Sequence, residues 1–187
     1  MTLHSPFPQV ILVDEHDHVI GRMEKHEAHK KGLLHRAFSI FILRKNEDDE
    51  TEVLLQMRGM DKYHSGGLLS NTACSHPQPG HELITEAEKC LNFELGITVP
   101  LKPIGKITYR AEFENSMTEH EIDHVFVGFY DEDTDNIPFN PDEIESLRWS
   151  TITTIAKDLG KNPHRYTAWF PKTFQCLQDF KGEHGNH

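Results

Sequence analysis

The chain has 187 residues, of which 36% are hydrophobic and 26% charged, and its formal net charge is −11. This composition is typical of a soluble globular protein, and we expect one domain over residues 1–187 with loose tails at 1–8 and 181–187. The acidic balance argues against nucleic-acid binding, and the lack of an apolar run of about 18 residues argues against a membrane span. Three cysteines indicate no disulfide framework, and residues 1–8 do not resemble a secretory signal, so we expect a cytoplasmic protein and a monomer.

Apolar runs and turn residues divide the chain into elements. Strands are predicted at 10–13, 19–21, 37–43, 53–57, 104–113, 121–130 and 146–149. The polar segment 25–31 is expected to be a connection, and 61–79 a long loop of the kind that is often functional. Helices are predicted at 82–95, 153–159 and 163–180, where Pro171 must break or kink the last one. Hairpin strands with interspersed helices indicate a mixed α/β or α+β sandwich.

Cys74 lies in the segment 69–77, two residues before His76. A Cys-x-His pair allows two interpretations, an activated thiol or part of a metal site. Free cysteine is also commonly a small buried hydrophobic residue. The position of Cys74 in a predicted loop favours reactivity, whereas Cys90 and Cys176 fall in helical patterns and are interpreted as packing residues.

Histidine and glutamate side chains can hold divalent metals, and candidates come from three separated segments. They are His29, His35, His76, Glu119 and Glu121. Taken alone, each histidine is more often a surface residue, and two glutamates on one face of a strand are more often a solvated face. Lys25, Arg58 and Lys62 are likewise most often solvated, but could hold a phosphate or diphosphate if they converged on one pocket. The residues by themselves therefore leave metal and anion binding open.

Four segments resemble the signature sequences of type 1 isopentenyl-diphosphate isomerases, and they occur in the order of that family. They are 32–39, 71–77, 109–110 and 119–121. The family belongs to the Nudix superfamily, so the resemblance implies a Nudix-type α/β (α+β) sandwich with a mixed β-sheet flanked by helices. It further implies an enzyme of isoprenoid biosynthesis that converts isopentenyl diphosphate into dimethylallyl diphosphate by a metal-dependent 1,3-proton shift.

The resemblance also implies a set of ligands. A divalent ion (Mn²⁺, Mg²⁺ or Zn²⁺) would be held by His29, His35, His76, Glu119 and Glu121. A Mg²⁺ ion on the substrate diphosphate would be held by Glu94. The diphosphate itself would be contacted by Lys25, Arg58 and Lys62. We therefore expect a small-molecule diphosphate as the partner, with no nucleic acid and no membrane.

Proton transfer is implied for Cys74 and Glu121, on opposite faces of the substrate. Protonation of an unactivated alkene gives a tertiary carbocation, so an acid and a base are both needed. Glu121, helped by Tyr109, is the expected acid, and a Cys74 thiolate is the expected base. Trp169 is expected to face the cation with its ring, although without the resemblance it would be interpreted as a core aromatic residue.

Departures from the family pattern fall in the segment 89–96, which keeps only Glu94 of the acidic positions of the Nudix helix. Cys90 stands where the family often has a basic residue, so a diphosphate contact is lost or supplied by Lys89, and Ala168 replaces a common proline. A Nudix hydrolase of a nucleoside or other diphosphate would need carboxylates where Cys90 and Phe93 stand. A non-enzymatic metal- or diphosphate-binding module has no use for Cys74 and Glu121 together.

Overall fold

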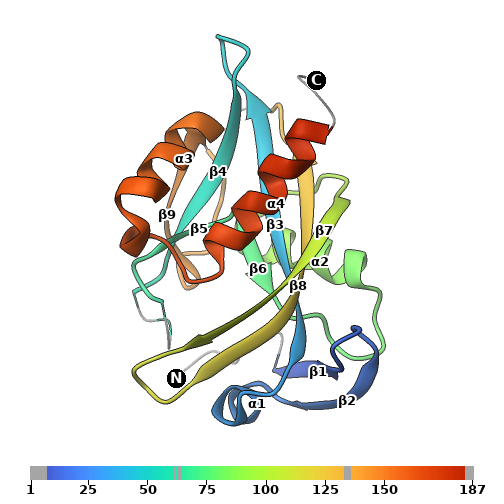
Figure 1. Cartoon of the computed structure of the whole chain (residues 1–187). Helices are drawn as coiled ribbons and strands as arrows, with labels where there is room; N and C mark the ends of the chain where they lie inside the picture. The colour runs from blue at the N-terminus through green and yellow to red at the C-terminus, as the bar shows by residue number, and fades with distance from the viewer. Residues whose placement is uncertain (1–7, 61, 63–64, 133–135, 184–187) are drawn as a thin grey trace.

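The computed structural model describes residues 8–60, 62, 65–132 and 136–183, which form a mixed nine-stranded sheet with helices on both faces (Figure 1). The strands are β1 Gln9–Val13, β2 Val19–Glu24, β3 His35–Lys45, β4 Thr51–Arg58, β5 Leu69–Ser70, β6 Ala73–Ser75, β7 Lys102–Glu112, β8 Thr118–Phe129 and β9 Ile144–Thr151. The helices are α1 Lys25–Lys31, α2 Leu83–Leu95, α3 Ile152–Lys161, the 3₁₀ turn η1 Pro163–Arg165 and α4 Phe170–Glu183. The mixed sheet flanked by helices confirms the predicted fold class.

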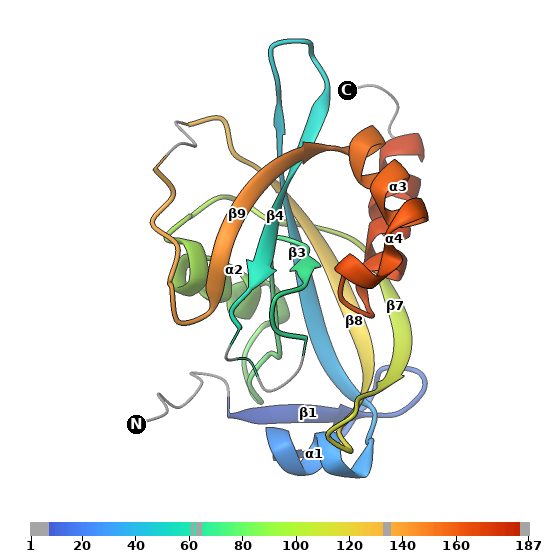
Figure 2. The ribbon, with the colours of Figure 1, turned by 90° about the vertical axis from the view of Figure 1, so that its left-hand side faces the viewer.

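Strand β3 is central to the sheet. It pairs antiparallel with β1, β4 and β6, and parallel with β8, whose other neighbour is β7. Helix α2 covers one face of the sheet, and α3 and α4 cover the other (Figure 2). The two covered faces explain why 37–43 is apolar except at Ser39, since a strand buried on both sides has no solvent-facing side.

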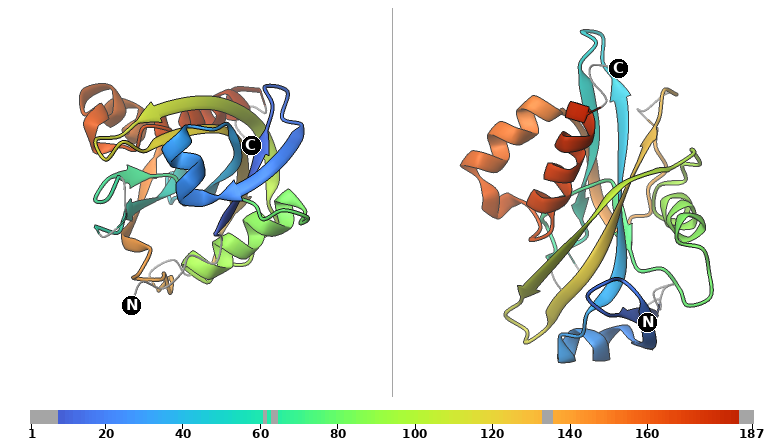
Figure 3. Two further views of the ribbon diagram at one scale, coloured as in Figure 1. Left: turned by 90° about the horizontal axis from the view of Figure 1, so that it is seen from below. Right: turned by 45° about the vertical axis from the view of Figure 1, so that its right-hand side comes forward.

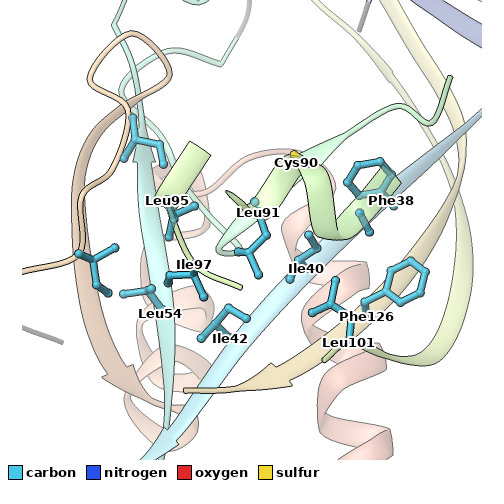
Figure 4. Close-up of a cluster of buried hydrophobic side chains, with 14 residues drawn as sticks. Phe38, Ile40, Ile42, Leu54, Cys90, Leu91, Leu95, Ile97, Leu101 and Phe126 are labelled. Atoms are coloured by element: carbon cyan, nitrogen blue, oxygen red, sulfur yellow. The ribbon is translucent and has the colours of Figure 1, made fainter. Parts of the chain in front are cut away.

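Side chains of β3 alternate between two cores. Phe38, Ile40 and Ile42 belong to the cluster that includes Leu91 and Leu95 of α2 (Figure 4). Phe41 and Leu43 point the other way and join Phe170, Phe174 and Leu177 of α4. Toward their ends at His35 and Thr118, β3 and β8 extend beyond α4, and α1 lies at this end of the sheet (Figure 3). This end, which α4 does not cover, holds the site described below.

The predicted strands are all present, although most extend beyond their predicted ends. Three other predictions were wrong. The segment 61–79 contains β5 and β6, which are too short to show a period, and 25–31 is helix α1. The segment 163–180 is not one kinked helix: after η1 the chain is irregular, and Pro171 lies in the first turn of α4, where its missing N–H costs nothing.

Helix α1 begins and ends with local signals. The Glu24 carboxylate accepts hydrogen bonds from the backbone N–H groups of His26 (3.1 Å) and Glu27 (2.9 Å). The helix ends at Gly32, which has the left-handed φ of 65° that favours glycine. Only Ala28 and His29 are buried, so no apolar period marks this helix in the sequence.

The tail prediction was wrong for 181–183, which continue α4, whereas 1–7 and 184–187 lie outside the described residues. No helix in the described part of the chain is long and apolar enough to cross a membrane.

Candidate active site

Glu121 lies in the middle of three paired strands. In the parallel β3–β8 ladder its partner is His35, and in the antiparallel β7–β8 ladder its partner is Tyr109. His35 Nε2 is 3.1 Å from Glu121 Oε1, and the Tyr109 hydroxyl group donates to Glu121 Oε2 at 2.9 Å. Strand register thus fixes a histidine and a tyrosine on the two sides of one buried carboxylate.

Two more histidines reach this carboxylate from other elements. His76, directly after β6, has Nε2 2.9 Å from the same Glu121 Oε1. His29 comes from α1, and its ring centroid is 5.0 Å from that of His35. One ligand atom from each of His29, His35, His76 and Glu121 lies within 4.8 Å of all the others, and the four residues are buried.

The donor set fits a divalent metal ion. His35 Nδ1 is 2.9 Å from the Leu33 carbonyl oxygen, which can only accept, so Nδ1 carries the proton and Nε2 of the neutral ring has a free lone pair. His76 Nε2 faces the same carboxylate oxygen as His35 Nε2, so a cation between them would have three ligand atoms around it. His76 Nδ1 is also buried without a hydrogen-bond partner among the described residues. Imidazole and carboxylate donors suit zinc and manganese, and the carboxylate also suits magnesium.

The electrostatics of the cluster favour an ionised Glu121 beside neutral His29 and His76 rings. Burial and the neighbouring His76 and His35 lower the pKa of His29 to about 2. Burial also lowers the pKa of His76, although Glu121 opposes this shift. For Glu121 burial acts upward, but hydrogen bonds from His35 and His76 outweigh it and hold the pKa well below its ordinary value. For His35 burial acts downward, and Glu121 outweighs it, so the pKa is raised.

Glu119 is not part of the group of four. Its carboxylate is buried on the same face of β8 and hydrogen-bonds with the Tyr109 hydroxyl group. Burial and the charges of Glu119 and Glu121 raise the pKa of Tyr109 well above its ordinary value. Tyr109 therefore stays protonated as a donor between the two carboxylates.

Cys74 is in strand β6, not in a loop as predicted, and its register partner on β3 is Ser39. Arg58 Nη1 lies 3.9 Å from its Sγ atom. Burial raises the pKa of the thiol to about 12, although the charge of Arg58 opposes this shift. Burial therefore favours the protonated thiol over the thiolate, and the role of Cys74 as a base stays a prediction.

A second group of charges surrounds Cys74. Burial and then Arg58 lower the pKa of Lys25, and they lower that of Lys62 to about 8. Burial raises the pKa of Glu94 on α2 to about 7, opposed by Lys62 and Arg58. Lys25, Arg58, Lys62 and Glu94 are thus within electrostatic range of one another, and the Lys62 ammonium group also contacts the Glu143 carboxylate.

Trp169 closes the site just before α4 and is 3% exposed. The Arg58 guanidinium carbon lies 5.2 Å from its ring centroid, and the Tyr109 ring lies at 6.3 Å. The indole Nε1 donates to Asn71 Oδ1 at 3.1 Å. The ring thus borders both groups of charged residues.

Sequence reasoning missed the polar residues that build this end of the sheet. Asp123 shares the face of Glu121, accepts a 2.7 Å hydrogen bond from Ser39 Oγ, and has its pKa raised well above the ordinary value by burial and by Glu121. Thr72 bridges β3 and β4 where these strands diverge, since its Oγ1 donates to Leu54 O (2.6 Å) and accepts from Ile42 N (2.9 Å), and the neighbouring Asn71 donates to Ile40 O of β3 (3.3 Å). The alternation of acidic residues at 119, 121 and 123 was an available signal for Asp123.

The sequence matches one protein family and several of its members. The family model for the NUDIX domain matches residues 33–170. The chain is 43% identical over 176 residues to the isopentenyl-diphosphate Delta-isomerase of Pectobacterium atrosepticum, with 94% of each chain covered. It is 46% identical to isopentenyl-diphosphate Delta-isomerase 1 of Aromatoleum aromaticum, covering 86% of this chain and 87% of the relative.

Solved structures share the fold at low sequence identity. DR0079 of Deinococcus radiodurans superposes with a TM-score of 0.67 at 15% identity, covering 91% of this chain and 98% of the other. A MutT protein of Methanosarcina mazei superposes with a TM-score of 0.58 at 21% identity, covering 80% of this chain and 95% of the other. The chain therefore belongs to the NUDIX domain family and, within it, to the isopentenyl-diphosphate Delta-isomerases.

Proposed function

We propose that this chain converts isopentenyl diphosphate into dimethylallyl diphosphate by a metal-dependent 1,3-proton shift. One observation carries the proposal: the buried His/Glu group around Glu121 and the cationic group around Cys74 meet at one end of the sheet. The charges of Arg58, Glu119, Glu121 and Cys74 all affect the pKa of Lys25, so this lysine lies within electrostatic range of both groups. The cationic group can bind the anionic diphosphate of the substrate, while the His/Glu group and Cys74 lie where the alkene would react.

The reaction adds a proton to the terminal carbon of the double bond and removes one from the carbon on the diphosphate side. We assign these transfers to Cys74 and Glu121, with Tyr109 hydrogen-bonded to Glu121 as the assisting donor. Cys74 rests as a thiol and Glu121 as an anion, so the pair already contains one proton donor and one acceptor. These states are the reverse of the roles expected from the resemblance, and both assignments need the same two residues.

We assign the divalent ion (Mn²⁺, Mg²⁺ or Zn²⁺) to His29, His35, His76 and Glu121, with Glu119 held nearby by Tyr109. A bound cation would lower the proton affinity of the Glu121 carboxyl group, which keeps it ionised at rest and makes it a stronger acid once it has taken up a proton. The diphosphate contacts are assigned to Lys25, Arg58 and Lys62, and a diphosphate-bound Mg²⁺ to Glu94. The Trp169 ring would stabilise the intermediate cation. A single domain, a monomer and a cytoplasmic location stay predictions.

A Nudix hydrolase is the less favoured function. Hydrolysis of a diphosphate would need several helix carboxylates around the pyrophosphate, but Cys90 and the half-exposed Phe93 occupy positions on α2 where they would stand. Glu94 is the carboxylate that α2 contributes beside Arg58 and Lys62.

The deciding experiment supplies isopentenyl diphosphate and divalent metal to the purified chain and follows dimethylallyl diphosphate by NMR. We expect conversion that a chelator abolishes and added metal restores. Phosphate release without dimethylallyl diphosphate would refute the proposal and favour the hydrolase.

Cysteine variants sharpen this test. We expect Cys74→Ala to lose about 10²- to 10⁴-fold in turnover, the usual contribution of a proton-transfer group. Cys176→Ala is the matched control, since that half-buried thiol is on α4 and faces Ile104 of β7, outside the groups described above. Equal turnover in the two variants would contradict the role of Cys74.

A further inference from the structure

The side chain of Asn71 is fully buried, and each of its polar atoms has two partners. Its Oδ1 accepts from Trp169 Nε1 (3.1 Å) and from Ser70 Oγ (2.8 Å). Its Nδ2 donates to the carbonyl oxygens of Ala73 (2.6 Å) and Ile40 (3.3 Å). Two acceptor bonds and two donor bonds use the full capacity of a carboxamide, so neither a carboxylate nor a short hydroxyl side chain can replace it.

We propose that Asn71 is a positioning residue for the isomerisation, because one amide fixes both the Trp169 ring and the strand that carries Cys74. The inference rests on the proposed function and adds a residue whose hydrogen bonds go to Trp169, to Ser70 and to the backbone of β3 and β6. It assigns to Asn71 the relative placement of two groups that come from segments far apart in the chain.

The hydrogen bond to Asn71 adds a directional contact to the packing of the indole ring. The Trp169 ring centroid lies 5.2 Å from the Arg58 guanidinium carbon and 6.3 Å from the Tyr109 ring centroid, and neither contact fixes the direction of Nε1. A hydrogen bond from Nε1 to an amide that is itself held by three other bonds selects one rotamer. Thr167 adds support, since its Oγ1 donates to Ser70 Oγ at 3.3 Å.

The same amide fixes the strand before Cys74. Ala73 and Ile40 are register partners of β6 and β3, and Asn71 Nδ2 bonds to the carbonyl oxygens of both. Cys74 follows at once, opposite Ser39. A shift of β6 against β3 would therefore break hydrogen bonds to Asn71, and the distance between the Cys74 thiol and the Trp169 ring would change. Misplacement by about 1 Å can cost about 100-fold in rate.

The experiment compares Asn71→Ala with Thr72→Val in the isomerase assay. Both changes remove buried hydrogen bonds to the backbone of β3 and its neighbours, but only Asn71 bonds to Trp169. We expect Asn71→Ala to lower kcat at least about tenfold with KM within about threefold, and Thr72→Val to keep kcat within about threefold of wild type. We also expect Asn71→Ala combined with Trp169→Phe to be less harmful than the product of the single effects.

A spectroscopic readout separates positioning from general damage. The chain has two tryptophans, so ¹⁵N-labelled protein gives two indole N–H signals, which a Trp149→Phe variant assigns. Trp149 Nε1 is buried without a hydrogen-bond partner among the described residues, and it serves as the internal comparison. We expect the Trp169 signal to have a hydrogen-bonded shift in the wild type and to lose it in Asn71→Ala, while the Trp149 signal stays in place.

The possible outcomes are distinct. Unchanged kcat in Asn71→Ala, or equal losses in Asn71→Ala and Thr72→Val, would overturn the inference and leave the proposed function intact. A wild-type Trp169 signal without a hydrogen-bonded shift would overturn it even if Asn71→Ala does not fold. A wild type that makes no dimethylallyl diphosphate would overturn the proposed function, and the inference with it.

Discussion

Two stretches of the same face of β3 and β8 differ sharply. Beneath α4, the inward residues are Phe41, Leu43, Val125 and Val127, and they pack against phenylalanines of the helix. Nearer the other end, residues of the same parity are His35, Ser39, Glu121 and Asp123. Both stretches are buried, and the alternation along the strands continues through both. The two stretches differ in what packs on them. The apolar face of α4 requires apolar partners, whereas α1 and Trp169 pack beside polar groups that bond to one another.

The comparison predicts that substitutions in the polar stretch cost activity, and those in the apolar stretch cost stability. The largest effect is expected for Glu121→Gln, which keeps the shape but removes the charge shared by His35 and His76. Turnover should fall about 10²- to 10⁴-fold with little change in far-UV circular dichroism. Glu112→Gln, an exposed residue at the end of β7, is the control. If Glu121→Gln were as active as this control, the polar stretch would not be needed for activity and the expected difference between the two stretches would be refuted.

Phe174→Ala tests the apolar stretch. Phe174 is 1% exposed and stacks on Phe170 with ring centroids 5.4 Å apart. Its truncation leaves a cavity, so we expect the free energy of unfolding to fall by about 3–5 kcal/mol in a denaturant titration. The kcat of the folded enzyme should stay within about threefold of wild type. A large loss of kcat in protein that is still folded would mean that the two stretches are not separable.

Asp17→Asn tests how the polar end is held from outside. The half-buried Asp17 carboxylate accepts from Arg36 Nε (2.9 Å) and contacts His124 Nε2 (2.7 Å), which joins the β1–β2 turn to β3 and β8. Burial would raise the pKa of Asp17, but Arg36 and His124 outweigh it and lower the pKa below 3.8. The folded-state pKa is thus depressed, so this stabilisation is complete above pH 3.8 and is lost as the pH falls through the folded-state pKa.

We expect Asp17→Asn to lower the free energy of unfolding by about 1.5–3 kcal/mol at pH 7. The difference from wild type should shrink at pH values below 3.8. Asp49→Asn is the matched control, because Asp49 is an exposed turn residue with a similar positive φ, 60° against 66° for Asp17. A difference that is independent of pH would exclude the ion pairs as its source.

The strands of the sheet could be predicted because burial on both faces leaves apolar runs such as 37–43. Helix α1 could not, since its buried residues Ala28 and His29 make no apolar period. Strands β5 and β6 are shorter than any period that a sequence can show. The candidate residues were named through the family resemblance, but nothing local in the sequence indicates that His35 and Glu121 are register partners. The protonation state of Cys74 depends on burial by distant segments, so the predicted thiolate could not be checked before the structure.

The parallel pairing of β3 with β8 also has a kinetic consequence. His35 and Glu121 are 86 positions apart, so their contact closes a long loop and forms only when most of the sheet has assembled. The histidine cluster therefore forms late in folding and does not contribute to the early steps. An ion that binds only the native state would slow unfolding and leave the rate of refolding unchanged.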